Sequence, residues 1–217
     1  MRIRHIIVLL AAGLTLWALP AFPDVPHTRG EALAGLASPD PAARAEALAW
    51  IAERGAMADT PLLQKRLRDE NPAVRNAAEE GLWRLWSRSG DARVDALMAR
   101  GAAEMQAGRL GAAIGTYSEA IRLKPGFAEG WNRRATAYYL AEEFEKSIAD
   151  CHEVLKRNPA HFGALSGLGQ IYAAMDRYED ALAWFRRALA ANPNLAGVQM
   201  SIHEMEQRIE ARRRRSI

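Results

Sequence analysis

The stretch FAEGWNRRATAYYLAEEFEKSIADCHEVLKRNPAH, residues 127–161, decides the fold of this 217-residue chain. It combines aromatic rings, arginines, a cysteine and two histidines, which could mark either an active site or a packed helix pair. Its position in the chain favours packing, because prolines stand 34 residues apart at Pro125, Pro159 and Pro193. A fixed period of this length indicates a repeat architecture. Proline also stops helices, so each one marks the end of a unit.

Alignment on these prolines divides the chain into three segments, 94–127, 128–161 and 162–195. Small residues recur at the eighth place of each segment, namely Gly101, Ala135 and Gly169. Apolar or aromatic residues recur at the twenty-fourth place, namely Tyr117, Cys151 and Phe185. Small side chains allow two helices to approach closely, and large ones fill the space beside them. Each segment is therefore predicted to form two packed helices.

This pattern resembles the tetratricopeptide repeat, a helix–turn–helix unit of 34 residues with small, aromatic and proline positions at fixed offsets. The resemblance implies an all-α fold, a right-handed α-solenoid of stacked helix pairs. The first segment departs from the pattern at three places, where Leu97, Arg100 and Glu104 replace the usual tryptophan, leucine and tyrosine. We expect this segment to be an atypical repeat at one end of the array.

Residues 22–90 contain a second, shorter repeat that resembles the HEAT-like units of bacterial proteins. Pro41 aligns with Pro72, and each follows a residue, Asp40 or Asn71, that can cap a helix N-terminus. The arginines three residues after these prolines, Arg44 and Arg75, also align. We expect them to form a structural ladder with aspartates or backbone carbonyls.

The N-terminal segment, residues 1–21, has the pattern of a secretory signal peptide. A basic start precedes the uncharged apolar run from Ile6 to Leu19, and prolines follow. Leu19 breaks the usual small-x-small cleavage pattern, so an uncleaved membrane anchor remains an alternative. Both readings predict a bacterial protein whose body lies outside the cytoplasm, either periplasmic or secreted, or anchored in the inner membrane and facing the periplasm.

Residues 196–217 are predicted to form a final helix that covers the exposed end of the solenoid. Its apolar residues lie on one face, namely Val198, Ile202, Met205 and Ile209. Arginines 212–215 follow at its C-terminal end, where positive charge suits the helix dipole. They form either a solubilising tail or a contact for anionic lipid or an acidic partner.

Catalytic, metal and nucleic-acid sites are not expected. The repeat register places Cys151 at a packing position, where a buried thiol is inert. No two histidines share the i, i+4 spacing of a zinc-binding helix, and no phosphate loop or nucleophile motif is present. The three repeats carry 12 Lys and Arg against 12 Asp and Glu, without the basic excess of a nucleic-acid binder. We therefore predict a non-enzymatic protein with no cofactor.

The resemblance implies that the first helix of each repeat lines a concave groove, with its second, fifth, ninth and twelfth residues facing inward. Glu129 has the second place in the middle repeat. The predicted partner-binding residues include Arg133, which lies beside this row at the sixth place. They are Met98, Met105, Asn132, Arg133, Thr136, Tyr139, Ser166 and Gln170. Lysine is absent from these positions, although the chaperone-tail-binding branch of the family uses lysines in a carboxylate clamp. The groove is therefore expected to be mostly neutral.

The predicted function is an adaptor or scaffold that holds a peptide or protein segment in this groove. Two alternatives are an envelope structural or assembly factor, which acts through its whole surface or by self-association, and an accessory that stabilises a catalytic partner.

Overall fold

The computed structural model describes residues 25–215, and the predicted signal peptide or anchor lies outside this range. The described chain is helical throughout, with no strand. The N-terminal helices are α1 (Arg29–Gly35), α2 (Pro41–Arg54), the short 3₁₀ helix η1 (Met57–Asp59), α3 (Thr60–Arg66) and α4 (Pro72–Ser87). The remaining helices are α5 (Ala92–Gln106), α6 (Leu110–Leu123), α7 (Ala128–Leu140), α8 (Phe144–Arg157), α9 (Phe162–Ala174), α10 (Tyr178–Ala191) and α11 (Ala196–Arg215).

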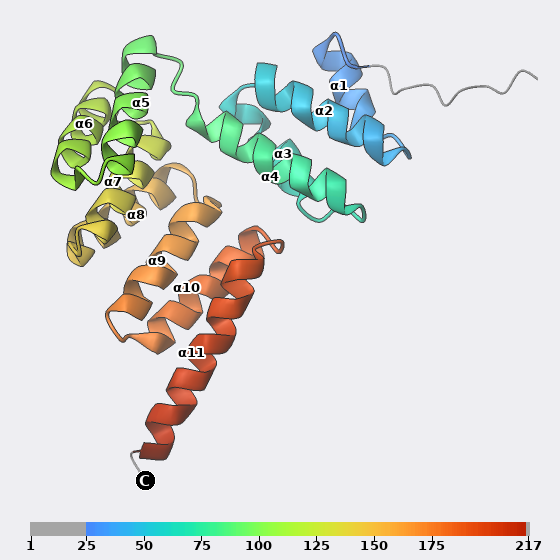
Figure 1. Cartoon of the computed structure of the whole chain (residues 1–217). Coiled ribbons are helices and arrows are strands. Elements are labelled where there is room, and N and C mark those ends of the chain that lie inside the picture. Colours follow the sequence, from blue (N-terminus) through green and yellow to red (C-terminus); the bar gives the residue numbers. More distant parts are fainter. Residues whose placement is uncertain (1–24, 216–217) are drawn as a thin grey trace, which may run out of the picture.

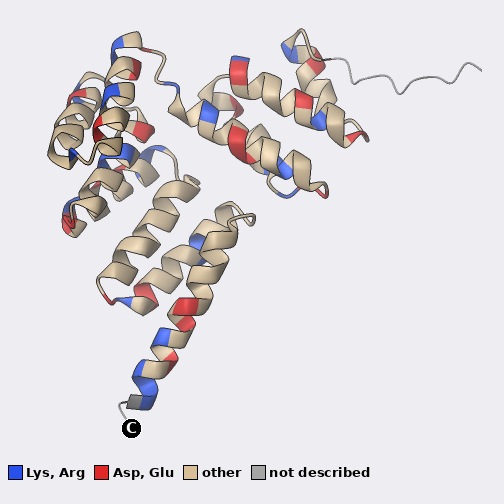
Figure 2. Cartoon of the chain, viewed as in Figure 1, with Lys and Arg blue, Asp and Glu red and all other residues tan. Residues whose placement is uncertain are grey.

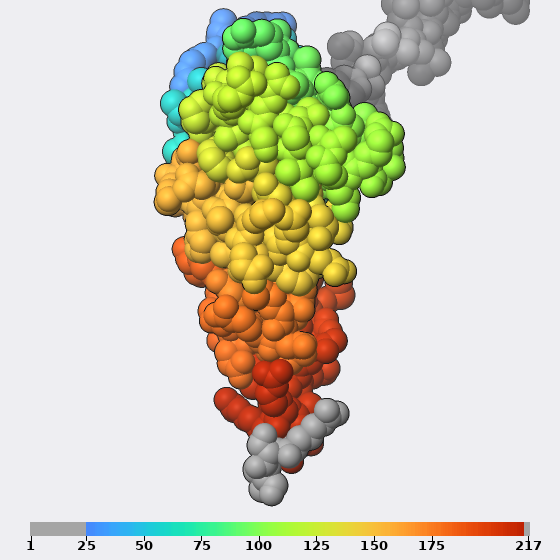
Figure 3. Space-filling model, turned by 90° about the vertical axis from the view of Figure 1, so that its left-hand side faces the viewer, coloured from blue at the N-terminus to red at the C-terminus, as the bar shows by residue number. Residues whose placement is uncertain are grey.

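The three predicted repeats are three antiparallel helix pairs, α5–α6, α7–α8 and α9–α10, which stack in order along the molecule (Figure 1). Each pair ends two residues before its proline, at Leu123, Arg157 and Ala191. The space-filling view shows the repeats and α11 following one another in a molecule that narrows towards the C-terminus (Figure 3). The all-α solenoid predicted from the sequence is confirmed. Across residues 25–215, no helix has both the length and the apolar composition needed to span a membrane.

The eighth and twenty-fourth places of each repeat are complementary in size. A Cβ atom added to Gly101 would lie 2.4 Å from the Tyr117 ring, and one added to Gly169 would lie 2.4 Å from the Phe185 ring. The middle repeat has Ala135 at the eighth place and Cys151, not an aromatic residue, at the twenty-fourth, and the two lie in one core cluster. The methyl group of Ala135 thus stands where its neighbours leave room for a ring.

The atypical residue Glu104 is buried although it is charged. Its carboxylate accepts hydrogen bonds from the Thr116 hydroxyl at 2.7 Å and from the Arg100 guanidinium at 2.9 Å. These hydrogen bonds, chiefly the one from Thr116, lower the pKa of Glu104. Thr116 and Arg100 therefore explain how the first repeat tolerates a glutamate where the family usually has tyrosine.

The predicted helix starts and arginine ladder of the N-terminal helices are confirmed. Asp40 and Asn71 cap α2 and α4 by accepting hydrogen bonds from the backbone N–H groups two residues later. Arg44 donates to both carboxylate oxygens of Asp69, at 3.0 and 2.7 Å. Arg75 donates to the Asp69 carbonyl at 2.9 Å. The two arginines thereby fix α2 and α4 to the loop that precedes α4.

Helix α11 covers the end of the third repeat, as predicted. Val198, Met205 and Ile209 are buried against a core that includes Tyr178 and Phe185. Figure 2 shows that basic residues gather at the C-terminal end of α11, whereas both signs of charge are mixed over the other helices.

The N-terminal helices also dock against the edge of the repeats. Phe162, the first residue of α9, lies in the core of the N-terminal helices together with Trp86. The His161 ring stacks on Trp86 with centroids 4.5 Å apart, and Trp83 meets both Phe162 and His161 edge to face. A Cβ atom on Gly163 would lie 2.5 Å from Trp83, so α4 and α9 require a glycine here.

A second set of contacts joins these helices to the loop between α10 and α11. Asn194 donates a hydrogen bond to the Leu67 carbonyl at 2.8 Å, and Asn192 donates one to Glu79 at 3.0 Å. Arg68 donates to the Ala190 carbonyl. The N-terminal helices therefore contact the far end of the array. The HEAT-like assignment of residues 22–90 stays a prediction.

Candidate partner-binding groove

A small hollow opens between α7 and α9, with part of α8 as its floor. Its volume is about 50 Å³. The residues that line it are Asn132, Ala135, Thr136, Tyr139, Ser147, Cys151, Gly163, Gly167, Gln170 and Ile171. Ala135, Cys151 and Ile171 form an apolar part of the wall. Gly167 has no side chain to narrow the α9 side, whereas the space beside Gly163 is occupied by Trp83.

The small hollow exists because the middle repeat lacks a ring at its twenty-fourth place. Tyr117 and Phe185 fill the corresponding space in the other two repeats, where they meet Gly101 and Gly169. Cys151 is smaller than these rings, and a Cβ atom on Gly167 would lie at 3.7 Å from its sulfur, an ordinary contact. Burial raises the pKa of the Cys151 thiol to about 12, so it is a poor nucleophile at neutral pH.

The rim of the small hollow is polar but uncharged. Tyr139 packs its ring near Phe144, and within residues 25–215 neither its hydroxyl nor the Gln170 amide forms a hydrogen bond. The side-chain amide N–H of Asn132 donates a hydrogen bond to the Glu129 carboxylate at 3.0 Å. Its side-chain carbonyl oxygen is left to accept a hydrogen bond from a ligand. The rim therefore offers both hydrogen-bond donors and acceptors to a ligand.

A larger hollow of about 240 Å³ adjoins the small one and extends to α11. Tyr139 and Gln170 line both hollows and so form the wall between them. The other residues that line the large hollow are Ala173, Ala174, Phe185, Ser201, Glu204, Met205 and Arg208. Glu204 accepts hydrogen bonds from Arg208 at 2.7 and 3.0 Å, so the two charges at its edge neutralise each other.

The predicted site residues divide into two groups. Four of the eight, Asn132, Thr136, Tyr139 and Gln170, converge on the small hollow. The other four are Met98, Met105, Arg133 and Ser166, and none of them lines either hollow. The two methionines pack, partly buried, against the core of the first repeat. Arg133 pairs with Glu129 at 2.6 Å, and Ser166 donates to the Gly163 carbonyl.

Glu129 does not face the groove as a solvated residue, as its place in the repeat had suggested. Its side chain is only 1% exposed, and it lies 3.3 Å from His161, which is fully buried. The Nδ1 atom of His161 accepts a hydrogen bond from the backbone N–H of Ala164, so Nε2 carries the proton that faces Glu129. No role was predicted for His161 from the sequence, so this one was missed; the signal was a histidine at the N-cap position of α9.

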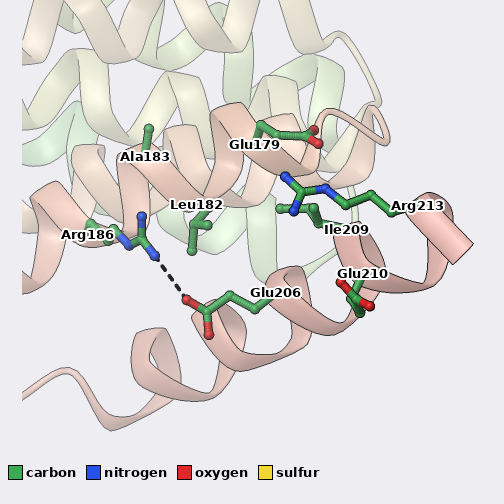
Figure 4. Close-up of a pocket in the computed structure, with 8 residues that line it drawn as sticks. All are labelled: Glu179, Leu182, Ala183, Arg186, Glu206, Ile209, Glu210 and Arg213. Carbon is green, nitrogen blue, oxygen red and sulfur yellow. Dashed lines mark hydrogen bonds and ion pairs between the residues drawn. The ribbon is translucent and has the colours of Figure 1, made fainter.

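A further hollow of about 450 Å³ lies between α10 and α11, away from every predicted site residue (Figure 4). Leu182 and Ile209 form its apolar part, and Arg186 pairs with Glu206 at 3.0 Å across it. Among the residues that the structure describes, no group of histidine, cysteine, aspartate and glutamate side chains is arranged to hold a metal ion.

Comparison with known proteins identifies the family. A family model described as tetratricopeptide repeat matches residues 72–128 and 132–196. The chain belongs to the tetratricopeptide repeat family. The match includes α4, so the repeat pattern of the family extends into the helix that we had assigned to the HEAT-like part.

Relatives from several kingdoms share parts of this tetratricopeptide repeat chain. A TPR repeat-containing protein of Rhizobium etli is 30% identical over 181 residues, which cover 81% of this chain and 89% of that protein. The small glutamine-rich tetratricopeptide repeat-containing protein 2 of Mycosarcoma maydis is 29% identical over 48% of this chain, but only over 29% of its own length.

Solved structures confirm the fold of the repeats. The Sgt2 TPR domain from Aspergillus fumigatus superposes with a TM-score of 0.55 and 24% identity, over 57% of this chain and 83% of that one. The first TPR of Spaghetti (RPAP3), bound to an HSP90 peptide, superposes with a TM-score of 0.53 and 22% identity. It covers 54% of this chain and 94% of that chain. Repeat proteins of this architecture use extended concave surfaces for binding.

Proposed function

We propose that this tetratricopeptide repeat protein is a non-catalytic adaptor that holds an extended segment of a partner protein in the groove formed by α7, α9 and α11. One observation carries the proposal: Asn132, Thr136, Tyr139 and Gln170, from two different repeats, converge on one hollow. The register of the repeat assigns these positions to the concave face independently of the hollow itself.

The hydrogen-bonding groups of the rim fit a peptide backbone. An extended peptide presents backbone N–H and C=O groups that need partners when a groove covers them. The Gln170 amide can donate to one and accept from the other, and the Tyr139 hydroxyl can do the same. Gly167 has no side chain to hold a backbone away from α9. Main-chain contacts of this kind supply affinity, and pockets for alternate side chains supply specificity.

The solved relatives support a peptide as the class of ligand. The first TPR of Spaghetti was solved with an HSP90 peptide, and the TPR2B domain of yeast Sti1 with an Hsp70 peptide. The basic side chains near this groove do not favour an acidic tail as the ligand here. Arg133 is paired with Glu129 and Arg208 with Glu204, so neither offers an unpaired positive charge.

We also propose that the adaptor works outside the cytoplasm. The support is residues 1–21, with their basic start, apolar run and following prolines. This segment either directs export and is removed or stays as an inner-membrane anchor. Fractionation of cells, with the size of the mature protein on a gel, distinguishes these two outcomes and a cytoplasmic protein, which would contradict the proposal.

The test of the groove is a crosslinking pulldown of the full chain from native cells, with the variant Asn132→Ala/Gln170→Ala beside it. The matched control is Asn76→Ala/Gln199→Ala, which removes the same two amide types from exposed sites on α4 and α11. We expect the partner to be retained by the wild type and the control but lost from the groove variant. A partner retained by all three would place recognition elsewhere and contradict the groove.

A further inference from the structure

We infer that the groove selects an uncharged, extended segment that places a small side chain in the small hollow and a larger apolar side chain in the large hollow. This inference rests on the proposed function, since it specifies the ligand of the same groove. It follows from the volume of the hollows, from their charge and from the wall that they share.

The volume of the small hollow limits the side chain that can enter it. A cavity that holds one water molecule has a volume of roughly 10–15 Å³. The 50 Å³ of the small hollow thus holds a side chain of a few atoms, such as that of Ala, Ser, Thr or Val, but no aromatic ring. The Ser147 hydroxyl in its wall already donates to the Ala135 carbonyl at 2.7 Å, so it can only accept a hydrogen bond from a ligand.

The lack of charged residues around the small hollow excludes an ionised ligand group. None of its lining residues carries a charge. The adjacent Arg133 is occupied by Glu129, which is itself buried. A carboxylate or an ammonium group would lose its water here without gaining an opposite charge, and such a transfer is strongly unfavourable.

The shared wall sets the spacing of the two ligand side chains. Alternate side chains of an extended peptide point the same way and lie roughly 7 Å apart. Since Tyr139 and Gln170 separate the two hollows by one layer of side chains, residues i and i+2 of the ligand can enter them together. Phe185 and Met205 give the large hollow an apolar wall with room for a larger side chain.

The chain itself supplies the variant that tests this inference. Because Gly169 accommodates the Phe185 ring, the double substitution Ala135→Gly/Cys151→Phe copies that pair into the middle repeat and fills the small hollow. Gly167→Leu fills it from the opposite wall. Gly115→Leu is the matched control, because Gly115 is an exposed residue of α6 with open space around it. Both Gly→Leu changes raise helix propensity by a similar amount, so the control matches that contribution to folding.

The experiment is selection of a displayed random-peptide library on the full chain, followed by affinity measurement with the peptides that are enriched. We expect uncharged peptides with a small residue two positions from a larger apolar one. Filling the small hollow should weaken their binding at least about tenfold, whereas Gly115→Leu should leave it within about twofold.

The outcomes separate the inference from the proposed function. Groove-dependent peptides that are acidic, or that bind equally well after the small hollow is filled, would overturn the inference and leave the proposed function standing. Peptides whose binding is indifferent to Asn132→Ala/Gln170→Ala, or a failure to enrich any peptide, would overturn the proposed function itself.

Discussion

The His161 imidazole stacks on the Trp86 indole, with ring centroids 4.5 Å apart and planes inclined by 25°. His161 is the last residue of the second repeat and directly precedes α9. Trp86 lies in α4, one of the N-terminal helices. Offset stacks of this kind add to the free energy that the rings gain by burial. This contact joins the N-terminal helices and the repeats into one core.

Removal of the Trp86 ring should therefore destabilise both parts of the molecule. Trp86 is 2% exposed, and large-to-small substitutions of buried tryptophan cost about 3–5 kcal/mol. We expect Trp86→Ala to lower the free energy of unfolding by about this amount in urea denaturation followed by circular dichroism. Trp184 of α10 is only partly buried, so Trp184→Ala should lower the free energy of unfolding by less. Equal losses in the two variants would contradict a special role for the contact between Trp86 and His161.

The Cys151 thiol should react slowly in the folded protein. A pKa of about 12 instead of 9.0 leaves about a thousandfold less thiolate at pH 8, and the thiolate is the reactive form. We expect labelling with a chromogenic disulfide to be slow in buffer and to accelerate as the pH rises. The urea-unfolded chain serves as the control and should label rapidly. Rapid labelling of the native protein would mean that the thiol is not buried.

The ion pair between Arg29 and Asp59 should contribute stability that acid removes. Arg29 donates two hydrogen bonds to the Asp59 carboxylate, and they hold the pKa of Asp59 below its ordinary value. The contribution is therefore complete above the unfolded pKa, near 4, and is lost as the pH falls through the lower folded pKa.

Melting temperatures between pH 6 and pH 2 test this sign. Asp59→Asn should melt below the wild type at pH 6, and the difference should shrink as the pH approaches 2. Asp180→Asn, at a half-exposed ion pair on α10, is the control and should change little at any pH. A difference between Asp59→Asn and the wild type that stays constant over the whole range would contradict the assignment.

Removal of α11 should expose the core of the third repeat. Val198, Met205 and Ile209 are each less than one-tenth exposed, and without α11 the apolar surface beneath them would meet water. We expect a chain that ends at Leu195 to aggregate, as measured by light scattering, and to bind a hydrophobic dye. A soluble truncated chain as stable as the full one would show that α11 is not a cap.

Most of the repeat fold could be predicted from the sequence, because it depends on local pattern. Three prolines at a fixed period determine where helices end, and the pairing of small with large residues determines which helices touch. The buried contact between Trp86 and His161 could not be predicted in this way. It depends on a contact between distant elements, and nothing near His161 in the sequence indicates that α4 lies over it.

The groove was predictable in part for the same reason. The repeat register identifies Asn132 and Gln170 as residues of the concave face, and they do line one hollow. It also assigned Met98 to this face, but Met98 packs against the first repeat's core. The hollow itself depends on the missing ring at Cys151, a difference in side-chain volume that a positional pattern records without revealing its consequence.

The contacts of Asn192 and Asn194 with the N-terminal helices have a consequence for how this protein can evolve. Repeat arrays usually gain or lose units freely, since each unit touches only its neighbours. Here the four residues 88–91, which join α4 to α5, can span at most about 14 Å. An inserted repeat would add a layer of about 10 Å between the two ends and separate Asn192 and Asn194 from the N-terminal helices. We therefore expect duplication or deletion of one repeat to cost the protein these contacts, unlike a change of length in an array whose ends do not meet.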